Sequence, residues 1–151
     1  MALKELIQAD MKTALLSGDR LRGNILRDLK AAILNEEVAA GKRDEGLGDE
    51  EIEKIVAREV KKRNESIKLY EQNDRMDLAE TEKNEIAVIQ QYLPEQVSEA
   101  EITTVVDEAI TGIDGASMKH MGQVIGAVKA KFGNGADGAL IAKIVKERLD
   151  S

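Results

Sequence analysis

Apolar residues recur every three or four positions along almost the whole chain, which is the spacing of one face of an α-helix. The first such stretch begins at Leu3 and is closed by Gly18. The second ends at about Ala40, and a charged, glycine-rich stretch over residues 41–48 follows it. This pattern predicts two consecutive helices and then a loop.

Two more helices are predicted before the single proline. Gly48 or Asp49 opens the third, because acids crowd its first turn, where the helix dipole favours negative charge. It ends near Asn73. The fourth opens at about Asp77 and is stopped by Pro94, because the residue before a proline is pushed out of the helical conformation.

Beyond the proline the chain is richer in glycine and predicts three short helices. A residue that can cap a helix precedes each of them: Ser98, Ser117 and Asp137. Ser98 has Glu101 three positions later, the spacing of a capping box. The middle helix is expected over about residues 118–132.

No alternation with the period of a β-strand persists anywhere in the chain. The predicted fold class is therefore all-α. We expect an N-terminal domain of about four helices over residues 1–94 and a small C-terminal three-helix domain over residues 95–151.

The amino-acid composition excludes several classes of catalytic and metal-binding protein. The net charge is −7, cysteine is absent and there is one histidine. Thiol catalysis, zinc knuckles and His-rich metal centres are therefore excluded, and we expect no metal and no cofactor. No apolar run approaches the ~20 residues of a membrane span, so we expect no membrane association and a cytoplasmic location.

Candidates for catalysis are few. His120 stands in the first turn of a predicted helix, where capping is a commoner role than general-base catalysis. Residues 133–138 form a glycine-rich turn, but it lacks the Lys-Ser/Thr of a nucleotide-binding loop and follows no strand, so ATP and GTP binding are rejected. We assign no catalytic residue.

The most positive stretch lies near the C-terminus. Six bases and two acids fall between residues 118 and 148 of this acidic chain. These bases are the candidate RNA phosphate contacts: Lys119, Lys129, Lys131, Lys143, Lys146 and Arg148. Ordinary surface lysines are the alternative interpretation.

Two other features suggest contacts. The third helix carries a second basic face, which is also compatible with a solvated, salt-bridged surface: Lys54, Arg58, Lys61, Lys62 and Lys68. Gly122 and Gly126 stand four apart within a predicted helix, where glycine costs roughly 1 kcal/mol relative to alanine. We expect a neighbouring helix or a ligand backbone to approach them closely.

Two blocks of sequence carry a family resemblance. The first runs from R-M-D-L through E-x-x-E-I to Y-L-P-E-Q and contains Arg75, Asp77, Glu82, Glu85, Tyr92 and Pro94. The second runs from M-G-x-V-I-G to G-A-D-G and contains Gly122, Gly126, Asp137 and Gly138. With L-R-x-x-x-L-R-x-x-K at residues 21–30, these blocks resemble the YqeY family over essentially the whole chain.

That family shares its fold with the tail of the GatB subunit of glutamine-dependent tRNA amidotransferase, a carbon–nitrogen ligase. The resemblance implies a helical protein that binds tRNA as an accessory to translation. It also implies that this chain alone does not catalyse transamidation, because it matches only the tail.

The motif residues can equally be structural. Asp77 can cap a helix while Arg75 pairs with an acid, and Glu82 and Glu85 can accept bonds at the junction between the domains. The alternative function is a helical protein–protein interaction module unrelated to tRNA, for which the partner is a protein.

Overall fold

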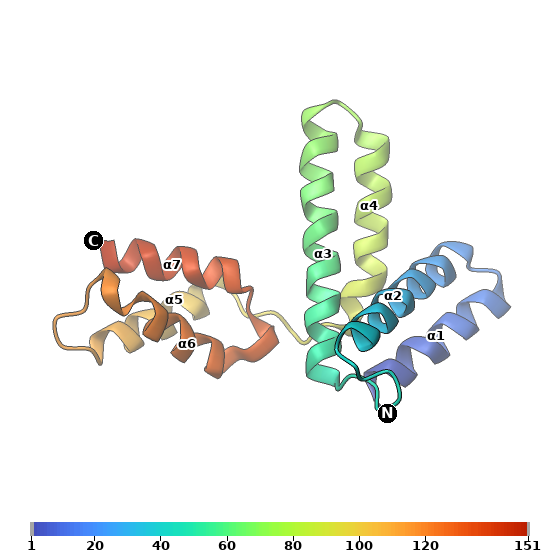
Figure 1. Ribbon diagram of the computed structural model, residues 1–151. Coiled ribbons are helices and arrows are strands. Elements are labelled where there is room, and N and C mark those ends of the chain that lie inside the picture. Colours follow the sequence, from blue (N-terminus) through green and yellow to red (C-terminus); the bar gives the residue numbers. More distant parts are fainter. Residues whose placement is uncertain (1, 151) are drawn as a thin grey trace. The chain divides into compact units, whose positions relative to one another are not determined.

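Figure 1 shows the computed structural model of the protein, in which residues 2–150 are described. This part of the chain holds seven α-helices, three short 3-10 helices and no strand, which confirms the all-α class. It divides into two units, Met1–Leu93 and Pro94–Ser151.

The first unit consists of two helical hairpins and a short turn. The helices are α1 (Leu3–Ser17), α2 (Arg20–Ala39), α3 (Asp49–Gln72) and α4 (Met76–Ile89), followed by the 3-10 helix η1 (Gln90–Tyr92). In Figure 1, α1 runs beside α2 and α3 beside α4, and the outer ends of α3 and α4 extend beyond α2. The apolar faces of the helices meet in one core, which includes Ile7, Leu26, Ile33, Ile52, Val56 and Ile89.

The helix ends follow from local chemistry. Gly18 closes α1 in the left-handed conformation, at φ 82°, which glycine adopts without steric cost. Asp19 caps α2, because its carboxylate accepts from the Arg22 N–H at 3.2 Å. Gly48 stands before α3, whose first turn is acidic as expected.

The fourth helix departs from the prediction at its end. It stops as an α-helix at Ile89 and tightens into η1 before the extended Leu93. A 3-10 turn is a common way to close a helix, because it pairs the last carbonyls with closer N–H groups. Pro94 therefore ends the helical segment, and the α-helix itself ends earlier.

The second unit is a three-helix domain. It contains α5 (Glu99–Thr111), η2 (Met118–His120), α6 (Met121–Phe132), η3 (Gly133–Gly135) and α7 (Gly138–Asp150). Its separate core consists mainly of Ile102, Val106, Val124, Val128, Ile141 and Val145.

The expected caps in this unit are present. The Ser98 side chain accepts from the Glu101 N–H at 3.1 Å, and the Asp137 carboxylate accepts from the Ala139 N–H at 3.1 Å. The helix expected over residues 118–132 is continuous but changes type along its length. It opens as the 3-10 helix η2 and becomes α-helical from Met121.

Candidate nucleic-acid interface

Positive and negative charge are segregated within the second unit. The helix α5 carries four acids and no base: Glu99, Glu101, Asp107 and Glu108. The helix α6 carries Lys129 and Lys131 and no acid, and α7 carries three bases, Lys143, Lys146 and Arg148, against two acids, Glu147 and Asp150. A basic side made of α6 and α7 therefore exists in a unit that is acidic as a whole.

Three of the candidate cations lie along or against α7. Lys143 and Lys146 are three positions apart on its exposed face, away from the buried Ile141, Ile144 and Val145. Lys129 reaches α7 from α6, since a Cβ added at Gly138 would stand 3.2 Å from its Cε atom and 3.3 Å from its Nζ atom. Across residues 2–150 none of the three lysines forms an ion pair. They can therefore meet an external anion.

The other three candidates are placed differently. Lys131 follows Lys129 by two positions, which places it on the opposite flank of α6. Arg148 pairs with Asp107 of α5 at 3.4 Å. Lys119 lies in η2, which packs on α7. Of the expected six, Lys131 thus faces away from Lys129 and Arg148 is already paired.

The expectation that a neighbouring helix packs closely on Gly122 and Gly126 is wrong for residues 2–150. Gly122 and Gly126 are exposed, and a Cβ added at either would meet nothing within 4 Å among the residues that the structure describes. No helix within residues 2–150 approaches them. Close approaches occur at other glycines, such as Gly23, where a Cβ would stand 2.5 Å from the Leu15 Cδ2 atom, and Gly135, where it would stand 3.2 Å from the Glu95 carbonyl oxygen.

The basic face of α3 is partly neutralised. Arg58 pairs with Glu36 of α2 at 2.9 Å, and Lys62 pairs with Glu59 at 3.7 Å. Lys54, Lys61 and Lys68 are exposed, and no ion pair is found for them over residues 2–150. Only part of this face is therefore the salt-bridged surface that was the alternative interpretation.

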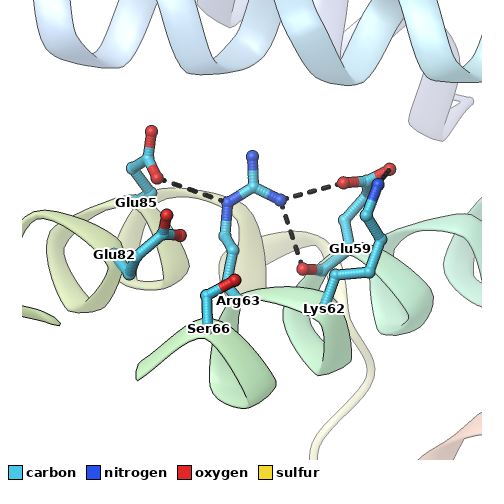
Figure 2. A pocket seen from close by; sticks show the side chains of 6 residues that line it. All are labelled: Glu59, Lys62, Arg63, Ser66, Glu82 and Glu85. Carbon is cyan, nitrogen blue, oxygen red and sulfur yellow. Dashed lines mark hydrogen bonds and ion pairs between the residues drawn. The ribbon is translucent and has the colours of Figure 1, made fainter. Parts of the chain in front are cut away.

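A small polar cavity of about 300 Å³ lies between α3 and α4. Figure 2 shows its lining, in which Arg63 extends between Glu59 and Glu85. The Arg63 Nη1 atom donates to Glu59 at 2.9 Å, and Nε stands 3.6 Å from Glu85. Burial and the neighbouring Glu82 raise the pKa of Glu85 above its ordinary value.

The contacts found for the motif residues in this region lie within the first unit. Glu85 binds Arg63 of α3, so the expected role of Glu82 and Glu85 at a junction between the domains is not what the contacts show. Arg75 does pair with an acid, Asp77, at 3.3 Å. That hydrogen bond lowers the pKa of Asp77, which lies in the first turn of α4 rather than at its cap.

Tyr92 is buried and anchors the end of the first unit. Its hydroxyl donates to the Asp10 carboxylate at 2.6 Å, and Arg22 stands 4.0 Å from the same carboxylate. Burial and this bond raise the pKa of Tyr92 far above its ordinary value. The Y-L-P block thus ties η1 to α1 and α2.

Sequence reasoning missed Asp10, Glu37 and Arg63, although a signal for them existed. Each occupies a polar position on an apolar face: Asp10 three residues after Ile7, Glu37 four after Ile33 and Arg63 four before Ile67. Glu37 is 1% exposed and accepts from Lys4 at 2.7 Å and from the Leu47 N–H at 2.9 Å. A charge on a buried stripe is expected to have a partner, which is what these contacts provide.

Two kinds of feature are absent from the described residues. Within residues 2–150 no group of three His, Asp or Glu side chains is arranged to hold a metal ion. None of the helices described is both long and apolar enough to cross a membrane.

A family model described as Yqey-like protein matches residues 4–149 of the chain. The chain belongs to the YqeY family. This membership agrees with the sequence blocks, whose residues Tyr92, Asp137 and Gly138 stand at the end of the first unit and at the start of α7.

Several curated relatives carry the name altered inheritance of mitochondria protein 41, mitochondrial. The chain is 29% identical to the one from Pyrenophora tritici-repentis over 145 residues, which cover 93% of this chain and 77% of that protein. It is 33% identical to the one from Lachancea thermotolerans over 107 residues, covering 70% and 56%. It is 38% identical to the one from Candida glabrata over 97 residues, which cover 63% of this chain and 52% of that protein. The chain thus spans about half the length of the last two relatives.

Proposed function

We propose that the protein is a tRNA-binding accessory protein, similar to the tail of GatB, and that it does not catalyse transamidation itself. It binds RNA phosphates through the side of the second unit formed by α6 and α7. The observation that carries the proposal is the grouping of Lys129, Lys143 and Lys146 along α7, exposed and without an ion pair over residues 2–150. Contacts of this kind to RNA are electrostatic and do not require base recognition.

The test is a filter-binding titration of the purified protein with total tRNA at two salt concentrations. Each phosphate contact contributes a log–log salt slope of roughly −0.7 to −0.9, so three contacts predict a roughly 20- to 40-fold loss of affinity for a fourfold rise in salt. Binding that stays unchanged with salt would contradict the proposal.

A pair of charge-reversed variants locates the surface. Lys143→Glu/Lys146→Glu changes α7, and Lys61→Glu/Lys68→Glu makes the same change in charge on exposed lysines of α3. The proposal expects the α7 variant to lose salt-sensitive binding and the α3 variant to keep most of it. The reverse result would place the RNA on α3.

A protein-interaction module is the second candidate, and the open surface at Gly122 and Gly126 favours it. If the protein binds no tRNA even at low salt, this candidate takes precedence. Gly126→Leu is then expected to abolish capture of a protein partner, since a bulky side chain would fill the surface.

The compartment is also part of the proposal. We propose the cytoplasm, from the sequence, while the names of the relatives place those proteins in mitochondria. Immunolocalisation of the protein in its own cells distinguishes the two.

A further inference from the structure

The start of α6 is fixed by a reciprocal pair of bonds between Ser117 and His120. The Ser117 N–H donates to His120 Nδ1 at 3.0 Å, and the Ser117 side chain accepts from the His120 N–H. A histidine accepts at Nδ1 only when it is neutral and carries its proton on Nε2. The geometry therefore requires an uncharged imidazole.

This capping box differs from the common one in its acceptor. The third position after the capping residue is usually Glu or Gln, whose oxygen remains an acceptor at all pH values near neutrality. An imidazole changes its charge in the physiological range, and both of its nitrogens become donors when it is protonated. The Ser117 N–H would then face another N–H.

The start of α6 itself offers nothing that offsets that loss. The first two turns of α6, Met121–Val128, contain no titratable side chain, and the positive end of the helix disfavours an added cation. The only other charge in η2 is Lys119, and the preceding loop contributes Asp114.

The element η2 also packs on α7, and the start of α6 lies beside the C-terminal end of α7 (Figure 1). The last turns of α7 carry both signs of charge, in Lys146, Glu147, Arg148 and Asp150. His120 forms no ion pair with any carboxylate in residues 2–150.

We propose that the Ser117–His120 box is a pH-sensitive switch, in which the Ser117 N–H loses its acceptor when His120 gains a proton. The change is confined to the cap, because the bonds from the His120 N–H to the Ser117 carbonyl and from the Met121 N–H to the Met118 carbonyl do not involve the ring. It does not depend on the proposed RNA binding.

The experiment follows amide signals by NMR on the whole protein between about pH 8 and about pH 5, the range in which imidazoles change charge. The Ser117 amide shift should follow the titration of the His120 ring. Its protection factor against hydrogen exchange should fall about fivefold on protonation, which is the effect of losing a typical cap. The Glu101 amide is the internal control, because it is capped by the hydroxyl of Ser98, which does not titrate.

The variant His120→Gln keeps an acceptor that does not titrate. In this variant the Ser117 amide should show no pH response beyond that of Glu101. If the Ser117 amide of the unmodified protein ignores the His120 titration, or if its pH response persists in His120→Gln, the switch does not exist. The first of these results needs no variant, so the test holds even if His120→Gln folds poorly.

Discussion

The side-chain amide of Gln96 donates a hydrogen bond to the main-chain carbonyl of Asn134 at 3.0 Å, although the two residues are 38 positions apart. Next to it, the Val97 N–H donates to the Gly135 carbonyl at 2.8 Å. The end of the Y-L-P-E-Q block and the glycine-rich turn before α7 are thus joined. The two most recognisable blocks of the sequence meet in one structural contact within the second unit.

Replacing Gln96 by alanine is expected to destabilise the second unit. The amide also donates to the Pro94 carbonyl at 2.9 Å, so the variant leaves two carbonyls without this donor. Because Gln96 is exposed and water can replace it, we expect a loss of about 0.5–1.5 kcal/mol in the free energy of unfolding. Urea unfolding measures it, and Gln123→Ala on the exposed face of α6 is the matched control. A loss of the same size in both variants would refute the role of the contact.

Tyr92→Phe tests the anchor at the end of the first unit. The change keeps the buried ring but removes the hydroxyl that donates to Asp10 at 2.6 Å. A hydrogen bond to a charged group contributes about 1.5–3 kcal/mol, so a loss in that range is expected. Thermal unfolding of Tyr92→Phe beside Tyr70→Phe measures it, since Tyr70 is only half-buried. If the Tyr92 variant is as stable as the parent, the bond contributes nothing.

The stability contributed by Glu37 should depend on pH. The hydrogen bond from Lys4 lowers the pKa of Glu37 from its ordinary value of 4.5, despite the opposing effect of burial. A carboxyl group whose pKa is depressed in the folded protein stabilises the fold at pH values above its pKa in the unfolded chain. This contribution disappears as the pH falls through its pKa in the folded protein. Glu37→Gln should therefore cost about 1–3 kcal/mol at pH 7 and progressively less below about pH 4.5.

Unfolding curves from about pH 7 to about pH 3 check this dependence. Glu36→Gln is the control, because its partner Arg58 holds it on an exposed surface. A gap between the Glu37 variant and the parent that stays constant over the whole pH range would show that the carboxylate charge is not what Lys4 stabilises.

Glu85→Gln should change the stability of the fold in the opposite direction from Glu37→Gln. Burial and Glu82 raise the pKa of Glu85, so its ionised form is less favourable in the folded state than in the unfolded chain. The neutral amide is then expected to stabilise the protein at pH 7, by a few tenths to about 1 kcal/mol. As the pH falls through the raised pKa, the parent gains stability by binding a proton and the gap closes. A destabilised variant at pH 7 would mean that the pairing with Arg63 outweighs burial.

Helix positions and most caps could be predicted from the sequence, because they depend on local spacing and on single residues such as Gly18, Ser98 and Asp137. The pairing of polar residues could not. Asp10 and Tyr92 are 82 positions apart, and only the folding of the first unit, in which η1 packs on α3 and α4, brings them together. The family resemblance drew attention to Tyr92 as a motif position without identifying its partner.

The candidate interface was predictable only in part for the same reason. A count of bases locates the positive stretch, but helix geometry separates Lys129 from Lys131, and Asp107 pairs with Arg148. The glycines show the limit of an energetic argument from sequence. Their cost to the helix is real, yet no part of residues 2–150 fills the space above them.

Gly126→Ala is therefore expected to stabilise the second unit. The added Cβ meets open space within a regular helix, so the variant should gain about 0.5–1 kcal/mol from the higher helix propensity of alanine. Gly135→Ala is the opposing control, because its Cβ would press on the Glu95 carbonyl at 3.2 Å and should destabilise the same unit.

Binding measurements on the same two variants test whether the surface at Gly126 takes part in binding. If Gly126→Ala is more stable but binds tRNA or a protein partner several-fold more weakly, the open surface of α6 is a contact surface. If it is more stable and binds as the parent does, the glycine has no role in binding, and the contact must be sought along α7. A Gly126→Ala variant that is less stable than the parent would contradict the open space seen above this helix.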